Sequence, residues 1–231
     1  PSISDSLHLY VQSGITNELV FKTRKSYNVT KDTLSVPVLS QLGTGDYIIT
    51  YTVIDSAGNS SVASAPLTIT VDFTQPNDPG ALILESASDA GESNSDKISN
   101  EDRVSITLTN ILPGYIGILY FIDDAALTLV DSMLLEPSEE SLTFLHSTDT
   151  TRTYQYTSVQ VDTAGNRSGY GDTLAIEIDQ TLPSAQISFE GDSLVRSGDV
   201  STIATFSFSE SMDNVNVPRV NINYPEVDFT L

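Results

Sequence analysis

The segment Asp55-Ser-Ala-Gly-Asn-Ser-Ser61 has a near copy, Asp162-Thr-Ala-Gly-Asn-Arg-Ser168, which lies 107 residues further along the chain. The match continues on both sides of this segment without a gap. The other matched positions are Tyr47 with Tyr154, Leu67, Ile69 and Val71 with Leu174, Ile176 and Ile178, and Asp72, Thr74 and Pro76 with Asp179, Thr181 and Pro183. So many matches at one offset indicate two copies of one structural unit. Each copy ends in the same strand and continues into the same linker.

The residues around these matches alternate between apolar and polar side chains, which is typical of half-buried β-strands. Leu67-Thr-Ile-Thr-Val71 and Ala204-Thr-Phe-Ser-Phe208 show this alternation, and no window shows a sustained helical period. Short strands, frequent turn signals and units of roughly 100 residues are typical of immunoglobulin-like sandwiches. The sequence therefore predicts an all-β fold of tandem immunoglobulin-like β-sandwich domains in an elongated array.

The repeat and its linkers divide the chain into three predicted domains. They are residues 1–75, residues 76–182, which include an acidic opening loop at Ser86–Asn100, and residues 183–231, which form a partial domain. The third is shorter than a full copy. Either this segment is cut from a longer chain, or strands from another chain complete the domain.

The composition is strongly acidic. The chain carries 31 acidic and 10 basic side chains, for a formal net charge of −21. This excess argues against nucleic acid or an anionic membrane as a partner. The carboxylates either solubilise the surface or supply oxygen ligands for a hard cation such as Ca²⁺, and the composition leaves both open. The chain has no cysteine, so packing or bound ions must stabilise the domains. No apolar run reaches the roughly 20 residues of a membrane helix, which predicts no membrane insertion in this segment.

One short motif raises the question of catalysis. Gly191-Asp-Ser-Leu194 spells the signature of a family of lipases and esterases that use this serine as the nucleophile. A nucleophilic serine needs a histidine base within hydrogen-bond reach. His8 and His146 both precede the motif and belong to other predicted domains, whereas that family carries its histidine far downstream. The motif is therefore interpreted as a turn, and the chain is predicted not to be an enzyme.

The order of motifs resembles that of a known family. An Asp-x-Ala-Gly-Asn turn precedes the last strand of each copy, the strand ends in Val-Asp or Ile-Asp, and Thr-x-Pro begins the next unit. This arrangement resembles the tandem bacterial immunoglobulin-like repeats of giant surface adhesins, and the loop Ser86–Asn100 is similar to the opening loop in calcium-dependent RTX-type adhesins. The resemblance implies an extracellular, cell-surface string of sandwiches with Ca²⁺ at or near the junctions. Its implied partners are neighbouring repeats of the same long chain and cell-surface or matrix components.

The same resemblance implies which residues hold the metal. The matching positions are Asp55, Asp72, Asp89, Asp96, Asp162 and Asp179. Ca²⁺ takes about six to eight oxygen ligands, which no single carboxylate supplies. We therefore expect Asp55 and Asp72 to lie together at one pole of the first sandwich, the end where the chain leaves it. The acidic loop is expected to fold back onto them, with Asp78 in the linker as a further donor. The alternative is that Asp-x-Ala-Gly-Asn is simply a favourable turn.

Three classes of function remain open. The first is a structural extender segment of a cell-surface adhesin, stiffened by Ca²⁺ at the interdomain junctions. The second is a surface-layer or extracellular filament subunit that assembles through its immunoglobulin-like domains. The third is a carbohydrate-binding accessory module, although the chain has no tryptophan to form a sugar platform. An extender should stay monomeric, a lattice subunit should assemble when Ca²⁺ is added, and a sugar binder should be captured on a glycan array.

Overall fold

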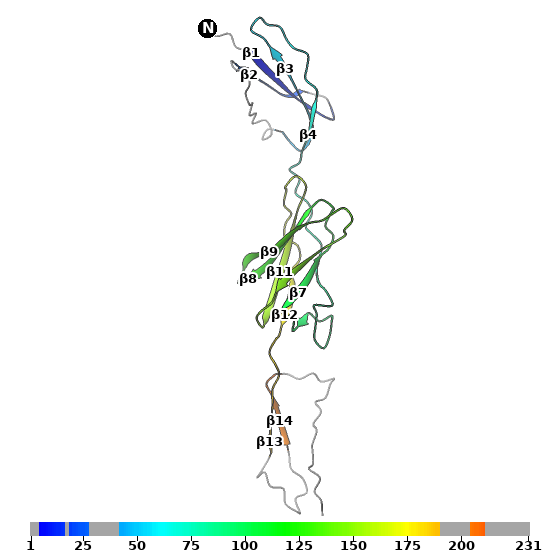
Figure 1. The fold of residues 1–231 in the computed structure, drawn as a ribbon, viewed down its shortest axis with the longest axis vertical. Coiled ribbons are helices and arrows are strands. Elements are labelled where there is room, and N and C mark those ends of the chain that lie inside the picture. Colours follow the sequence, from blue (N-terminus) through cyan, green and yellow to red (C-terminus); the bar gives the residue numbers. More distant parts are fainter. Residues whose placement is uncertain (1–4, 17–18, 28–41, 190–203, 211–231) are drawn as a thin grey trace, which may run out of the picture. The chain divides into compact units, whose positions relative to one another are not determined.

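A computed structural model of the chain describes residues 5–16, 19–27, 42–189 and 204–210 (Figure 1). The described residues form β-strands, turns and loops, so the predicted all-β class is confirmed. The chain divides into two compact units, Pro1–Asp179 and Gln180–Leu231. The first unit holds two separate hydrophobic clusters, one in a four-stranded sheet and one in a two-layered sandwich. The motif Gly191–Leu194 lies outside the described residues.

The four-stranded sheet is antiparallel and has the order β2-β1-β3-β4. Its strands are β1 (Asp5–Ser13), β2 (Leu19–Tyr27), β3 (Gly45–Ile54) and β4 (Leu67–Val71). One face of the sheet carries a small core, because alternate side chains of each strand point to the same side. The buried members of that core are Val11, Leu42, Tyr47 and Val71, with Leu9, Ile49 and Ile69 packed against them.

The sandwich is built from a three-stranded and a five-stranded sheet. The first has the order β10-β7-β5, from β10 (Leu142–Ser147), β7 (Arg103–Leu108) and β5 (Leu82–Leu84). The second has the order β6-β12-β11-β8-β9, from β6 (Ile98–Ser99), β12 (Leu174–Ile178), β11 (Arg152–Val161), β8 (Ile116–Asp123) and β9 (Ala126–Leu134). Strands β5, β7 and β10 thus form one layer, and β6, β8, β9, β11 and β12 form the other. This is the strand partition of an immunoglobulin-like sandwich, with β5, β7 and β10 as strands A, B and E.

The sandwich core lies between the two sheets. It includes Ile106 and Leu108 from β7, Leu119 from β8 and Ile176 from β12, all with 0% exposure. Gly117 lets the layers approach closely, because a Cβ at this position would lie 2.6 Å from Cδ1 of Leu142. A core of this size, assembled from both layers, accounts for a stable domain that has no disulfide.

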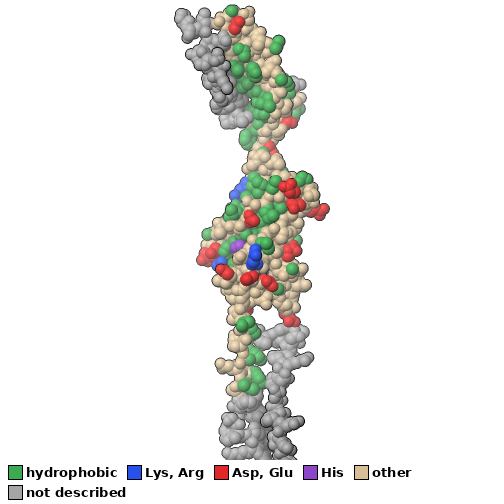
Figure 2. Space-filling model, in the orientation of Figure 1, with side chains coloured by type: hydrophobic (Ala, Val, Ile, Leu, Met, Phe, Trp, Pro, Cys, Tyr) green, Lys and Arg blue, Asp and Glu red, His purple; other side chains and the backbone are tan. Residues whose placement is uncertain are grey.

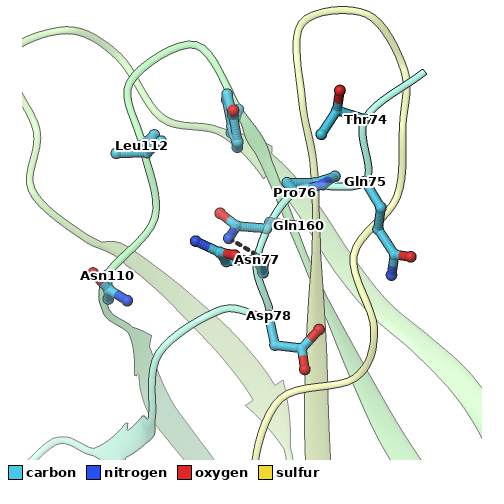
Figure 3. Close-up of a pocket in the computed structure, with 9 residues that line it drawn as sticks. Thr74, Gln75, Pro76, Asn77, Asp78, Asn110, Leu112 and Gln160 are labelled. Carbon is cyan, nitrogen blue, oxygen red and sulfur yellow. Dashed lines mark hydrogen bonds between the residues drawn. The ribbon is translucent and has the colours of Figure 1, made fainter. Parts of the chain in front are cut away.

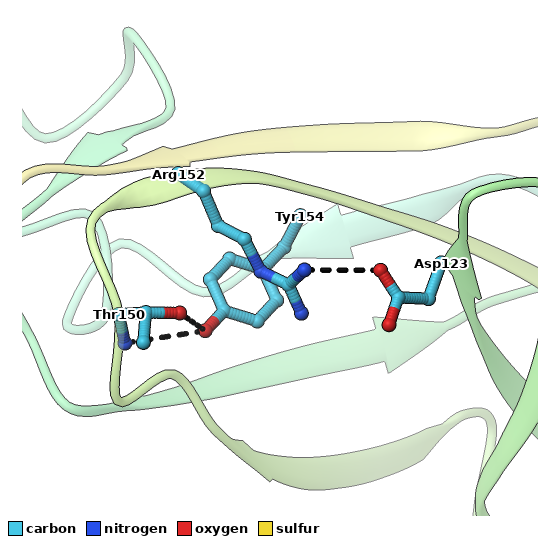
Figure 4. Close-up of polar contacts among 4 residues, drawn as sticks. All are labelled: Asp123, Thr150, Arg152 and Tyr154. Atoms are coloured by element: carbon cyan, nitrogen blue, oxygen red, sulfur yellow. Dashed lines mark hydrogen bonds and ion pairs between the residues drawn. The ribbon is translucent and has the colours of Figure 1, made fainter.

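The two copies of the repeat fold alike at the start of strands β3 and β11. The Tyr47 hydroxyl donates to the carbonyl oxygen of Gly43 at 3.0 Å. In the second copy, the Tyr154 hydroxyl accepts from the Thr150 amide at 3.4 Å and lies 2.9 Å from Oγ1 of Thr150 (Figure 4). A tyrosine bonded four residues upstream at the start of strand F is the tyrosine corner of immunoglobulin-like domains. The matched tyrosines in the sequence are therefore explained by this corner.

Arg152 covers the outside of the second tyrosine corner. Its guanidinium lies 4.6 Å from the ring centroid of Tyr154, and Nη1 lies 3.0 Å from Oδ1 of Asp123 (Figure 4). Both charged side chains are more than two-fifths exposed. An ion pair at this exposure stabilises the fold by less than about 1 kcal/mol, so the corner depends mainly on the tyrosine.

The second unit contains β13 (Ala185–Phe189) and β14 (Ala204–Phe208), which pair antiparallel. The pairing places Ile187 opposite Phe206 and Ala185 opposite Phe208. Ile187, Phe206 and Phe208 are between 37% and 52% exposed. The pair therefore presents an apolar face.

Candidate metal sites

The strand directions place the predicted ligands at opposite ends of each sheet. In the first sheet, Gly45 at the start of β3 lies opposite Val71 at the end of β4. Asp55, which follows β3, and Asp72, which follows β4, are therefore at opposite ends. The expectation that they share one pole is wrong, because residues that follow two neighbouring antiparallel strands cannot meet. The same holds for Asp162 and Asp179, since Arg152 lies opposite Ile178.

The segment between β4 and β5, called the first linker, instead contacts the Asp162–Ser168 turn of the second copy. Nδ2 of Asn166 donates to the main-chain oxygen of Asp72 at 3.0 Å and to Oδ2 of Asp162 at 2.9 Å. Nε2 of Gln160 donates to the main-chain oxygen of Asn77 at 2.7 Å (Figure 3). Gln160 is only 3% exposed, so the second bond is shielded from water. Two amide side chains of the sandwich thus hold the linker by its backbone.

The linker remains close to the sandwich up to β5. A Cβ on Gly169 would lie 2.5 Å from Oδ1 of Asp78, and a Cβ on Gly80 would lie 2.6 Å from the main-chain oxygen of Thr109. The Gly80 amide also donates to that oxygen at 3.0 Å. Asp72, Asp78 and Asp162 are therefore at the same end of the sandwich, beside a cavity of about 310 Å³ lined by Asn77, Asn110, Tyr115 and Gln160, among others (Figure 3).

The carboxylates of Asp55 and Asp162 are engaged by their own turns. Oδ1 of Asp162 accepts from the amides of Ala164 and Asn166 at 2.9 and 2.8 Å. Asp55 makes the equivalent bonds to Ala57 and Asn59 at 2.9 and 2.8 Å. Each carboxylate also accepts from the asparagine side chain of its motif. This geometry explains the motif by turn chemistry, and the role of the two residues as metal ligands remains a prediction.

These bonds change the acidity of both groups. For Asp162, desolvation by the surrounding chain raises the pKa, but hydrogen bonds from Asn166, Ala164 and Gly165 outweigh it, so the pKa is lowered overall. For Asp55, the bonds from Asn59 are the main cause of a lowered pKa. A carboxylate that accepts several N–H bonds is favoured in its charged form. Both turns are therefore held most tightly while these groups are ionised.

Replacing Asp162 by asparagine is expected to destabilise the sandwich in a pH-dependent way. Because the folded pKa lies below the unfolded value of about 3.9, the wild-type advantage is present above that pH and is lost as pH falls through the folded pKa. Urea midpoints measured between pH 7 and pH 2 should show a gap between wild type and Asp162→Asn that closes toward the acid limit. Asp172→Asn, at an exposed position, is the control. A gap of constant size across this range contradicts the assignment.

The acidic loop lies at the other end of the sandwich. β5 carries the chain away from the first linker, since Leu82 lies opposite Leu108 and Leu84 opposite Ile106. After the loop, β6 runs parallel to the end of β12, and the Asp179 amide donates to the Ser99 oxygen at 2.9 Å. The expectation that this loop folds onto Asp72 is therefore wrong. It lies beside Asp179, at the end of β12.

Asp89 is the unusual member of this loop. It is 4% exposed, and its Oδ2 accepts from the amide of Lys97 at 3.1 Å. Its Oδ1 is buried and has no hydrogen-bond donor. Lys97 itself has a φ of 65°, in the left-handed region that is unfavourable for a residue with a side chain. Asp96 is exposed, and its Oδ1 accepts from the amide of Ile98 at 3.0 Å.

The buried Oδ1 of Asp89 is the feature at this end that bears on metal binding. A buried carboxylate oxygen without a donor is costly unless a proton or a cation neutralises it. Asp89, Asp96 and Asp179 lie in the loop and strand end that meet here. In the part of the chain that the structure describes, no three acidic or histidine side chains converge as a ready-made site. A Ca²⁺ ion here would therefore take main-chain and hydroxyl oxygens beside Asp89, as calcium sites commonly do.

Both histidines lie in strands of the described structure. His8 lies in β1. His146 lies in β10, with Nδ1 2.9 Å from the Tyr156 hydroxyl and its ring 5.6 Å from that of Phe121. Burial, followed by the positive charge of Arg152, lowers the pKa of His146.

Comparisons with known proteins give the fold type a context. No family model and no curated protein matches the sequence. Among solved structures, the chain is similar to a tetra-tandem repeat from the extending region of a large adhesion protein, with 12% identity and a TM-score of 0.36, covering 82% of this chain and 46% of that one. It is also similar to a biofilm-associated protein BSP domain (11% identity, TM-score 0.31, 77% and 26% covered). A third match is to fibronectin(III)-like modules of Clostridium thermocellum CbhA (16% identity, TM-score 0.38, 77% and 80% covered).

The chain spans less than half of the first of these proteins. The assignment of the sandwich therefore depends on the strand order and the tyrosine corners given above. Among the described residues, no helix has the length and apolar character needed to cross a bilayer.

Proposed function

We propose that this chain is an extender segment of an extracellular, cell-surface adhesin, in which bound Ca²⁺ stiffens the junctions between immunoglobulin-like domains. The observation that supports the metal part of the proposal is the buried Oδ1 of Asp89, which has no donor among the described residues and lies in the loop beside the end of β12. Neighbouring repeats of the same long chain are the partners that this role requires. Cell-surface or matrix components are the partners of the assembled adhesin.

The proposed ion would connect the linker to the sandwich. At the second junction, the loop that carries Asp89 and Asp96 already contacts the strand end at Asp179 through Ser99. An ion shared by loop and strand end would restrict the linker that starts there. At the first junction, Asn166 and Gln160 already restrain the linker, and the carboxylate of Asp162 is bonded to its own turn, which leaves Asp72 and Asp78 as the carboxylates that would bind an ion there. The two junctions thus differ in how much of their stiffness depends on the ion.

Small-angle X-ray scattering with and without a calcium chelator tests the proposal. We expect the maximum dimension to be larger and more narrowly distributed when Ca²⁺ is bound, because a stiff linker samples fewer domain orientations. Mg²⁺ at the same concentration is the control, since it prefers a smaller octahedral site. Identical scattering curves in Ca²⁺ and in chelator would contradict the mechanical part of the proposal.

A surface-layer or filament subunit is the second candidate. The observation that favours it is the exposure of apolar side chains in each compact unit. They are Tyr51, Val53 and Leu67 in the four-stranded sheet and Ile187, Phe206 and Phe208 in the β13–β14 pair. Such faces are typical of surfaces that bind another chain.

A further inference from the structure

Strand β9 has an outer edge that no described strand covers. It is the last strand of the five-stranded sheet, where it pairs with β8 alone (Figure 1). All residues of this sandwich, 76–179, are described, so the edge belongs to a complete domain. β9 is nine residues long, and all but one of them are exposed. The outward main-chain groups of such an edge strand are available to pair with a further strand.

The outer face of the β8–β9 hairpin is apolar. Leu129 lies opposite Tyr120 of β8, and directly opposite residues of antiparallel strands share one face. Leu127 lies opposite Ile122 on the same face. The two leucines are 58% and 42% exposed, respectively. A strand added to the edge of β9 could therefore bury apolar side chains against them.

The charge around this edge is of one sign. Between Arg103 and Arg152 the sequence has no lysine or arginine, whereas its acidic residues there are Asp123, Asp124, Asp131, Glu136, Glu139, Glu140 and Asp149. Apart from Asp149, they lie in β9, at the end of β8, or in the segments that flank β9. Figure 2 shows the same excess of acidic over basic side chains on the visible face of the sandwich.

β9 has few of the features that protect edge strands from pairing. Natural proteins often place lysine or proline on such strands, and Ala126–Leu134 contains neither. It does have a bulge at Val130, because Leu129 and Asp131 lie opposite consecutive residues of β8. The strand is therefore interrupted once, but four residues on each side of the bulge keep a regular edge.

We propose that β9 binds an extended, cationic segment of another protein, which joins the five-stranded sheet as a further strand. Apolar side chains of this segment would lie on Leu127 and Leu129. Its alternate, basic side chains would lie on the opposite face with Asp131, which is exposed although it is opposite the buried Leu119. Oδ1 of Asp131 accepts from the Ser132 amide at 2.7 Å, which holds this carboxylate at the edge. The site thus selects a sequence in which apolar and basic residues alternate.

A second copy of this chain does not fit the same edge. Two β9 strands side by side would bring their carboxylates together, and like charges on neighbouring strands are destabilising. The net charge of −21 adds long-range repulsion between copies. A basic partner is therefore favoured over self-pairing, and an extender that stays monomeric can still bind it. Binding at β9 needs no Ca²⁺, so it can be tested separately from the proposed junction sites.

Fluorescence anisotropy with the full 231-residue chain tests this site. The probe is a labelled peptide of about eight residues in which lysine and valine alternate, a length that matches β9. The control peptide has the same composition, but all its lysines precede its valines, so it keeps the charge and loses the two faces. We expect the alternating peptide to bind at least about tenfold more tightly. Its affinity should fall as salt is raised, because part of the attraction is electrostatic.

Leu129→Lys and Leu145→Lys form a matched pair of variants. The two leucines are 58% and 57% exposed, and Leu145 lies on β10, at the edge of the other sheet. Each variant gains one positive charge, so long-range repulsion of the peptide is the same in both. A lysine on the β9 edge also opposes strand pairing. Leu129→Lys should therefore bind the alternating peptide at least about tenfold more weakly than Leu145→Lys does.

Amide hydrogen exchange locates the bound peptide. In the complex, amides within Ala126–Leu134 should gain protection, while those of β10 should not. Failure of the alternating peptide to bind would overturn the proposal, and so would added protection confined to other strands. Equal affinity for the two peptides would show that the acidic surface attracts any polycation without strand pairing. Equal affinity of the two lysine variants would place the contact away from β9.

Discussion

Removal of Ca²⁺ is expected to lower the melting temperature of the sandwich by about 10–20 °C. Calcium at about a hundred times its dissociation constant stabilises the bound state by about 2.7 kcal/mol per site. In a domain of roughly 100 residues, each kcal/mol shifts the melting temperature by about 4–8 °C. The effect should be concentrated in this sandwich, because the donorless oxygen of Asp89 is buried within it. Differential scanning calorimetry in about 10 mM Ca²⁺ and in chelator measures the shift.

Asp89→Asn separates the ion from other effects on the loop. The variant keeps the shape of the side chain and an acceptor for the Lys97 amide but removes the negative charge. It should melt at the same temperature with and without Ca²⁺. In chelator it should be at least as stable as wild type, because wild type then retains an uncompensated buried carboxylate. Asp131→Asn, on the exposed strand β9, should keep the full calcium response. A calcium shift of wild-type size in Asp89→Asn would rule out this site.

Replacing Leu119 by alanine is expected to reduce the free energy of unfolding of the sandwich by about 2–5 kcal/mol. Leu119 is fully buried in β8, between β11 and β9 in the five-stranded sheet. Its truncation removes apolar contacts and leaves a cavity that the two layers cannot easily fill. The denaturant midpoint should fall while the slope of the transition stays unchanged.

Leu129→Ala is the matched control for this substitution. Leu129 lies in the neighbouring strand β9 and is 58% exposed. Its truncation should change the free energy of unfolding by no more than about 0.5 kcal/mol. Equal losses in the two variants would show that the assigned core is wrong.

The strands could be predicted from the sequence because alternation and burial agree along most of them. Leu67–Val71 and Ala204–Phe208 are β4 and β14 with the same bounds. The repeat also predicted equivalent turns, and the two aspartate motifs make the same hydrogen bonds. In each case the prediction depends on residues that are close in sequence, so it needs no knowledge of the tertiary structure.

The grouping of the aspartates could not be predicted in the same way. It depends on which strand ends meet, and this follows from the antiparallel order of β11 and β12 rather than from distance along the chain. Nor could the sequence single out Asp89 among the acidic residues of its loop, because its burial comes from the fold of the loop itself. The division into residues 1–75, 76–182 and 183–231 remains a prediction.

One missed feature left a signal in the sequence. Ser158 and Gln160 fall on the inward face of β11, where alternation predicts apolar side chains. Their polarity marks the place where the linker packs onto the sandwich, since Gln160 needs the main chain of Asn77 as a partner. A polar break in an otherwise apolar strand face can therefore indicate a contact with a linker segment.

Asn166 and Gln160 grip carbonyl oxygens of the linker backbone, and every amino acid supplies such an oxygen. Substitutions at Asp72 or Asn77 would therefore leave these two hydrogen bonds in place, whereas substitutions of Asn166 or Gln160 would remove them. The path of the linker at these two points is thus set by the amide side chains of the sandwich and does not depend on which side chains the linker carries. A unit that carries both amides could therefore change the side chains at these two linker positions and keep both bonds.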